Sequence, residues 1–154
     1  MKILLLYIGK TTESYLIDGI ATYVRRLSNY IAVKEAVVPA SVFKDKRRAQ
    51  EEEENQIARQ LLTGDFVVAL DERGKQLSST ELAGQAEQWM SRSIKRVVFV
   101  VGGAYGFSKT FLENADFLLS LSKLTFTHQM VRLVLAEQLY RAMTIIRNEK
   151  YHHG

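Results

Sequence analysis

The sequence alternates between apolar runs of strand length and segments with helical periodicity, and this alternation restricts the fold more than any other feature. The runs are KILLLYIG near the start, IAVKEAVVP from Ile31, DFVVALD from Asp65, KRVVFVVGG from Lys95 and the shorter DFLLSLS from Asp116. Three of them are continuously apolar and rich in Val, Ile and Leu, which is typical of strands covered on both faces. Such strands belong in the middle layer of a fold, with helices on either side.

The segments between the runs have the patterns of amphipathic helices. One stripe of SYLIDGIATYVRRL carries Leu16, Ile20, Tyr23, Val24 and Leu27. The segment SSTELAGQAEQWM opens with Ser78 and Glu81 at the spacing of a capping box. Strands that alternate with helices predict an α/β fold of three layers, α/β/α, with a mostly parallel sheet. No repeat or linker divides the chain, so we expect residues 1–154 to form a single domain.

The composition excludes several classes of protein. The 154 residues include no cysteine, which rules out disulfide frameworks, thiolate zinc sites and cysteine nucleophiles. No apolar run approaches the roughly 20 residues of a membrane helix, and the apolar start is too short for a signal peptide. We therefore expect a cytoplasmic protein that makes no membrane contact. The net charge of +4 favours a polyanionic partner only modestly.

The segment KDKRRAQEEEENQIARQLL places a basic block before four consecutive glutamates. One interpretation is a solvated helix face that is anchored by Ile57, Leu61 and Leu62. The other is a basic turn, Lys44 to Arg48, that contacts phosphate. Because lysine and arginine at a helix start oppose the helix dipole, we expect the basic block in the loop before the helix.

A glycine-rich loop, GGAYGF, follows the fourth apolar run. Glycines at the carboxyl end of a strand let backbone approach a ligand closely, and ligands of open α/β sheets bind at that edge. The spacing of Gly102, Gly103 and Gly106 differs from the GxGxxG of dinucleotide-binding folds, which normally follows the first strand. A tight turn without a ligand is the alternative for this loop taken by itself.

The next loop, LSLSKLTFTHQM, ends at the same edge of the predicted sheet, so the two loops can lie side by side. Its backbone groups and the hydroxyls of Ser122 and Thr125 suit an adenosine-like ligand. The apolar walls for such a ligand are Leu121, Leu124 and Phe126. The alternative is that Thr127 caps the final helix and the rest only connects, and both interpretations can hold together.

The last predicted helix, from about His128 to Arg147, is apolar nearly all round. One sheet covers one side of a helix, so the second side predicts contact with another subunit in a homodimer. Glu137 and Arg141 stand at the spacing of a helix-surface ion pair. Arg132 and Arg147 are better candidates for contacts with phosphate.

The chain ends in RNEKYHHG. A mobile, solvated end is one interpretation of this tail. Tyr151 beside His152 also suits stacking on a base and handling its proton. The adjacent histidines and the distant His128 lack the spacing and carboxylate support of a zinc site, so we expect no metal.

Taken together, VALDERGKQLSS, FVVGGAYGFS, LSLSKLTFTHQMVRLVLAEQLYRA and the terminal KYHHG resemble the SPOUT-class methyltransferases of the ribosomal RNA large-subunit methyltransferase H family. The likeness spans essentially the whole chain. It implies methyl transfer from S-adenosylmethionine to N3 of a pseudouridine in helix 69 of 23S ribosomal RNA, by a homodimer acting on the assembled 70S ribosome. It also implies a trefoil knot in the C-terminal half, which periodicity does not predict because chains rarely knot.

Carried over residue by residue, the resemblance implies a cofactor site made by three segments. They are Leu70, Gly102, and Leu121, Ser122, Lys123, Leu124, Thr125 and Phe126. We include Gly103, the next residue of the glycine loop, among the candidates. The terminal Tyr151 and His152 match the Tyr-His of the family, which implies catalytic roles for them. Candidates for RNA contacts, chosen for their residue types, are Arg132, Arg147, His128 and His153. The sequence departs from the family at Thr127 and Lys150, where relatives often have proline, and at His153, where they usually have a cationic residue.

Two other functions compete with this one. A basic ribosome-binding protein of the same fold would need no cofactor, but both loops keep the form found in the family. A flavodoxin-like nucleotide protein would place its ligand loop after the first strand, where this chain has one glycine. No Ser/His/Asp set or paired carboxylate indicates a hydrolase.

Overall fold

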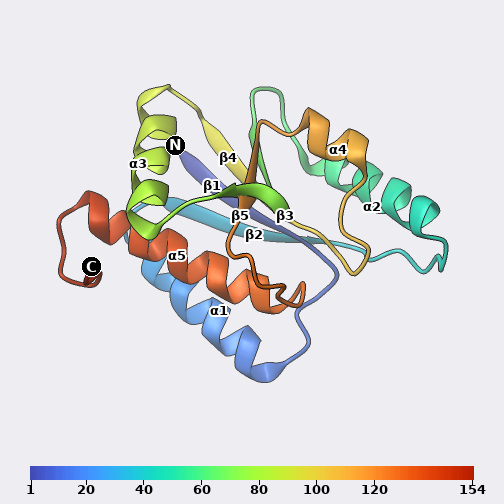
Figure 1. The fold of residues 1–154 in the computed structure, drawn as a ribbon, viewed down its shortest axis with the longest axis horizontal. Coiled ribbons are helices and arrows are strands. Elements are labelled where there is room, and N and C mark those ends of the chain that lie inside the picture. Colours follow the sequence, from blue (N-terminus) through green and yellow to red (C-terminus); the bar gives the residue numbers. More distant parts are fainter.

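The computed structural model describes residues 1–154 as three layers, a parallel sheet with helices on both faces (Figure 1). The strands are β1 (Lys2–Ile8), β2 (Ala32–Val38), β3 (Phe66–Gln76), β4 (Arg96–Val101) and β5 (Phe117–Ser120). Their order across the sheet is β2-β1-β4-β3-β5, and every neighbouring pair is parallel. The predicted α/β fold is therefore confirmed, and all of its strand pairs are parallel.

The helices divide between the two faces. One face is covered by α1 (Ser14–Leu27), α3 (Ser79–Ser91) and α5 (Met130–Ile146), and the other by α2 (Lys46–Gln60) and α4 (Lys109–Asn114). None of the helices combines the length and the apolarity needed to cross a bilayer.

The two central strands form the core of the molecule. Residues 3–8 of β1 and 97–101 of β4 are all buried, as the continuous apolar runs predict. Trp89 of α3 packs edge-on against Phe99 of β4 with ring centroids 6.0 Å apart, and its exposed fraction is only 1%. Burial of each such large side chain stabilises the fold by about 1.5–3 kcal/mol relative to exposure.

Hydrogen bonds at the helix starts confirm one prediction and correct another. Ser78 Oγ accepts a hydrogen bond from the Glu81 amide at 3.1 Å, and Glu81 Oε2 accepts one from the Ser78 amide at 2.8 Å, which is the predicted capping box. The basic block was expected before α2, but residues 46–48 form its first turn. Asp45 makes this possible, because its carboxylate caps the helix at the Arg48 amide, 3.0 Å away.

The apolar anchors of α2 are fewer than the sequence suggests. Ile57 is fully buried and Leu61 is half-buried, but Leu62 is 65% exposed. The helix ends at Gln60, so Leu62 lies beyond the periodicity that would turn it inward.

Helix α5 lies between α1 and α3 on the same face of the sheet (Figure 1). None of its residues is more than partly exposed, because flanking helices cover its sides. The sheet and the flanking helices of the same chain thus cover most of the apolar surface of α5. The homodimer stays a prediction.

Candidate functional site

A pocket of about 760 Å³ opens at the carboxyl edge of the sheet, where three consecutive strand ends meet. It is lined by residues 70–73 of β3, by residues 101–107 from the last residue of β4 onward, and by residues 119–122 and 124–128 from the end of β5 onward. Lys46 of α2 and Val131 of α5 complete the lining. The volume is in the range of small-molecule sites. The prediction that the glycine loop and the following loop lie side by side is confirmed.

The glycine loop presents backbone to the pocket. The Gly106 amide donates a hydrogen bond to the Gly103 carbonyl at 3.0 Å, and Gly106 has a φ of +66° that favours glycine. Phe107 is buried beneath the loop, and a Cβ on Gly102 would lie 3.3 Å from its ring. A side chain at Gly102 would therefore crowd the floor of the pocket.

The loop after β5 is shaped by its own serines. Ser120 Oγ donates to the Ser122 carbonyl at 3.0 Å, and the Leu124 amide donates to Ser122 Oγ at 2.9 Å. Leu121 and Phe126 are partly buried, as walls should be, but Leu124 is 74% exposed at the rim.

The candidate residues of this loop do not all reach the pocket. Those that line it are Leu121, Ser122, Leu124, Thr125 and Phe126. Lys123 is exposed and does not line the pocket. Its place among the cofactor contacts is therefore not supported by the position of its side chain.

The middle of β3 contributes charged groups that the sequence did not single out. Beside the predicted Leu70, the Asp71 carboxylate pairs with the Arg73 guanidinium at 2.8 Å. Burial by itself raises the pKa of Asp71, but the hydrogen bonds from Arg73 outweigh it and hold the pKa below its ordinary value. The pairing of β3 with β5 shifts register between Leu70 and Lys75, and this irregularity places Asp71 and Glu72 at the pocket.

His128 and Arg132 were both predicted to contact RNA, and the structure separates them. His128 lines the pocket, where burial and then the positive charge of Arg132 lower the pKa of its imidazole. Arg132 is fully buried. Its guanidinium donates to the carbonyls of Ile8 at 2.8 Å and Gly9 at 2.9 Å and to the hydroxyl of Thr11 at 2.9 Å.

The prediction that Arg132 contacts phosphate is therefore wrong, because the guanidinium instead ties the start of α5 to the end of β1. The helical spacing of apolar residues in the sequence indicates that Arg132 is buried. Arg132 stands three, four and seven positions before the buried Leu135, Ala136 and Leu139, which places it on the inner stripe of the helix.

Thr127 supports the same end of α5. Its hydroxyl accepts a hydrogen bond from the Met130 amide at 3.1 Å, and its carbonyl accepts one from the Val131 amide at 3.1 Å. Both bonds satisfy amides at the start of α5, but the N-cap position is Gln129, whose side chain makes no capping hydrogen bond. Thr127 therefore supports the start of the helix from the turn before it. Proline in place of Thr127 would lack the hydroxyl.

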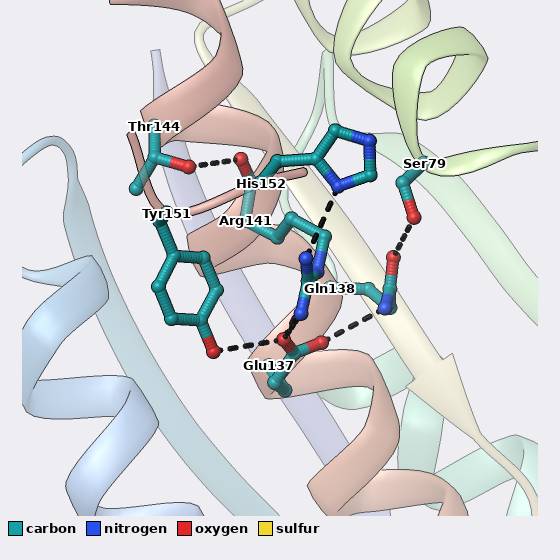
Figure 2. Close-up of polar contacts among 7 residues, drawn as sticks. All are labelled: Ser79, Glu137, Gln138, Arg141, Thr144, Tyr151 and His152. Carbon is teal, nitrogen blue, oxygen red and sulfur yellow. Dashed lines mark hydrogen bonds and ion pairs between the residues drawn. The ribbon is translucent and has the colours of Figure 1, made fainter. Parts of the chain in front are cut away.

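A mobile, solvated end was one interpretation of the tail, but the tail is folded back onto α5 (Figure 2). The Tyr151 hydroxyl donates to Glu137 Oε1 at 3.0 Å, and its ring meets Tyr140 edge-on with centroids 4.7 Å apart. Arg141 Nη1 lies 3.1 Å from His152 Nδ1, while its Nη2 pairs with Glu137 at 2.6 Å. The predicted Glu137–Arg141 pair is thus confirmed, and it anchors the tail.

Neither Tyr151 nor His152 lines the pocket of its own chain. They are attached to the second half of α5, whereas the pocket lies at its first turn. At 1.5 Å per residue, Arg141 stands roughly 15 Å along the helix from Val131. Burial, followed by the neighbouring Tyr23 and Glu137 side chains, raises the pKa of Tyr151 above its ordinary value, so its phenol is a hydrogen-bond donor and not a base.

Two further RNA candidates lie on the surface. Arg147 is exposed, with its guanidinium 4.8 Å from the ring centroid of Tyr30, and His153 is exposed at the end of the tail. No three His, Asp or Glu side chains are grouped so that they could hold a metal ion.

Comparison with known proteins connects this arrangement to a family. Residues 1–152 match the family model described as "Predicted SPOUT methyltransferase". The chain belongs to the SPOUT methyltransferases. Curated relatives of this SPOUT chain are named ribosomal RNA large subunit methyltransferase H. The protein from Parabacteroides distasonis is 46% identical over 156 residues and that from Syntrophotalea carbinolica 43% over 155, with 99% of each chain covered in both cases.

Solved structures agree at the level of the fold. A probable methyltransferase from Bordetella pertussis superposes with a TM-score of 0.58 at 13% identity, covering 92% of this SPOUT chain and 96% of its own. A probable methylase family protein from Haemophilus influenzae gives 0.55 at 14% identity, covering 99% and 70%. The trefoil knot stays a prediction from the family resemblance.

Proposed function

We propose that this SPOUT chain transfers a methyl group from S-adenosylmethionine to N3 of a pseudouridine in helix 69 of 23S ribosomal RNA, in the cytoplasm and on assembled 70S ribosomes. The observation that carries the proposal is the convergence of the glycine loop and the loop after β5 on one pocket. Relatives that are 40–46% identical over nearly their full length are named as methyltransferases of large-subunit ribosomal RNA.

The pocket has the features that the methyl donor needs. Gly102 and Gly103 offer backbone without side chains, Leu70 and Leu121 offer apolar contact, and the loop from Ser122 to Phe126 offers further amides and carbonyls. When bound there, S-adenosylmethionine supplies an electrophilic methyl group on a sulfonium, which requires no metal. The task of the chain is to hold the acceptor nitrogen in line and to accept or stabilise its charge.

The N3 proton of the base must be removed before the methyl group is transferred. Two histidines are candidates to accept it, His128 and His152. His128 is at the pocket, and its lowered pKa keeps the imidazole neutral and able to accept a proton at neutral pH. His152 lies outside the pocket of its own chain. A role for Tyr151 and His152 at the base therefore requires a homodimer in which the tail of one chain reaches the pocket of the other.

Exposed cations near the pocket suit the phosphates of RNA. Lys46 lines the pocket, and residues 44–48 around it are basic except for Asp45. None of these cations forms an ion pair with a carboxylate. These cations are free to bind a polyanion, as are Arg147 and His153 at the other end of α5, away from the pocket. Such binding should weaken as salt is added.

Ribosomes from a strain that lacks the helix 69 methyl group provide the test. The protein is incubated with these ribosomes and isotopically labelled S-adenosylmethionine, and the 23S RNA is digested and mapped by mass spectrometry. We expect one labelled methyl group, on N3 of a helix 69 pseudouridine. Ribosome binding without transfer would favour the alternative, a non-catalytic ribosome-binding protein of the same fold.

A further inference from the structure

Helix α2 supports the glycine loop with polar side chains from the run EEEE and from the residue before it. The sequence alone does not distinguish these side chains from their solvent-exposed neighbours. Glu51 is exposed, but Gln50 and Glu53 are 8% and 4% exposed, and Glu54 is partly buried. The inner stripe Ala49, Glu53, Ile57 has helical spacing, so a carboxylate occupies a position between two fully buried apolar residues. The run is therefore not a uniformly solvated face.

Two of these side chains hold the loop, one near its middle and one at its carboxyl end. Gln50 Nε2 donates to the Tyr105 carbonyl at 3.0 Å. Glu54 accepts two hydrogen bonds from Ser108, one from its amide at 2.7 Å and one from its hydroxyl at 2.6 Å. Ser108 in turn caps α4 at the Phe111 amide, 3.1 Å away. The loop is thus fixed to α2 where it passes the pocket and where it enters the next helix.

The third side chain lies under the glycines. Glu53 Oε2 accepts from the Ser41 amide at 2.9 Å, whereas its buried Oε1 has no partner. A Cβ added to Gly103 would lie 3.3 Å from that Oε1. Burial, which outweighs the Ser41 hydrogen bond, raises the pKa of Glu53. A carboxyl group that is costly to bury in its charged form is therefore packed directly beneath the loop.

We propose that Gln50, Glu53 and Glu54 are positioning residues for methyl transfer, which hold the backbone of residues 102–108 in the shape that binds the methyl donor. None of the three lines the pocket, so each acts through the loop and not by touching the ligand. The inference rests on the proposed function, because it takes the pocket as the site of S-adenosylmethionine.

Glu54 gives the sharpest substitution. Glu54→Ala removes both bonds to Ser108, whereas Glu54→Gln keeps an acceptor for the Ser108 amide and places a donor beside its hydroxyl. Glu51→Ala is the matched control, since it removes the same charge from an exposed position of the same helix. If Glu54 only stabilised the fold as a whole, Glu54→Ala would speed hydrogen exchange throughout the protein. A positioning role instead predicts faster exchange in the loop alone, and affinity that Glu54→Gln restores.

Two measurements on the full chain test the proposal. The first is hydrogen exchange of the amides of residues 103–108 in the free protein, and the second is calorimetric titration with S-adenosylmethionine. We expect Glu54→Ala to speed exchange in this loop and to weaken binding by about ten- to a hundredfold, the range for one or two lost charge-assisted hydrogen bonds. Glu54→Gln should stay within about threefold of the unsubstituted protein, less than one such bond, and Glu51→Ala should be unchanged.

The outcomes separate the two claims. If the unsubstituted protein does not bind S-adenosylmethionine, the proposed function fails, and hydrogen exchange still decides the role of α2. If Glu54→Ala does not fold, Gln50→Ala replaces it in both measurements, because it removes only the neutral hydrogen bond to the Tyr105 carbonyl. The inference would be overturned if Glu54→Ala and Gln50→Ala had the same hydrogen-exchange rates in the loop and the same affinity for S-adenosylmethionine as Glu51→Ala.

Discussion

Replacement of Gly74 by alanine should damage the pocket through the backbone of β5. A Cβ at Gly74 would lie 2.6 Å from the Leu118 carbonyl carbon, 2.7 Å from its oxygen and 2.8 Å from the Leu119 nitrogen. The shortest of these is about 0.8 Å inside the 3.4 Å at which ordinary contact begins, and backbone atoms in a close-packed sheet cannot move aside cheaply. The peptide that joins Leu118 to Leu119 must therefore shift.

Overpacking of this kind costs about 1–3 kcal/mol of the free energy of unfolding, and we expect the upper end because the clash is with backbone. For a chain of this size, about 3 kcal/mol lowers the melting temperature by roughly 6–12 °C. Leu119 begins the segment that lines the pocket, so affinity for S-adenosylmethionine should also fall, by at least about tenfold. Circular dichroism melting and calorimetric titration measure the two effects.

Gly84→Ala is the control for this experiment. Gly84 lies inside α3, and a Cβ there would have open space around it. Alanine should stabilise that helix by about 0.5–1 kcal/mol and leave cofactor affinity unchanged. A Gly74→Ala variant that melts and binds like the unsubstituted protein would show that β3 does not approach β5 as closely at Gly74 as these distances indicate.

Four further predictions concern other parts of the molecule. Gly102→Val should fold but not bind S-adenosylmethionine in a calorimetric titration, because a branched side chain would press on Phe107 and fill the space before the loop; normal binding would mean that the site is misplaced. Because the pKa of Glu53 is raised above its ordinary value of 4.5, its neutral form stabilises the fold at low pH and this contribution is lost as pH rises through the raised pKa. The melting temperature of Glu53→Gln relative to the unsubstituted protein should therefore increase over that pH window, and a constant difference would contradict the burial of a titrating carboxyl. Removal of residues 151–154 should leave cofactor affinity nearly intact but lower the single-turnover methylation of ribosomes by about a hundredfold, as expected for a lost acid–base or positioning group; full activity would shift the role of proton acceptor to His128. Sedimentation at micromolar concentration should give twice the chain mass of 17.6 kDa, whereas a monomer would exclude a site shared between two chains.

Local patterns predicted the frame of the molecule. Continuous apolar runs predicted the central strands, and Ser78 with Glu81 predicted the start of α3, because both signals depend on neighbours in the chain. The position of the pocket could be predicted by combining these local patterns with one rule of sheet topology. Parallel strands end at one edge, so the loop of Gly102 and the loop of Leu121 had to approach each other.

Features that depend on contacts between distant segments were not predicted. The helical spacing indicates that Arg132 faces inward, but its partners, the carbonyls at the end of β1, lie more than a hundred residues away along the chain, and no local pattern identifies them. Glu53 is one of four identical letters, and only the packing of α2 against the glycine loop distinguishes it from Glu51. The docking of the tail likewise depends on the Glu137 carboxylate, which Tyr151 reaches only because the chain turns back after α5.

The proposed cofactor site is best tested by a crystal structure of the chain with S-adenosylmethionine. We expect the ligand in the pocket at the carboxyl edge of the sheet, between the glycine loop at Gly102 and the segment from Leu121 to Phe126. Electron density for the ligand at any other place, or an unchanged pocket without ligand at saturating concentration, would contradict it.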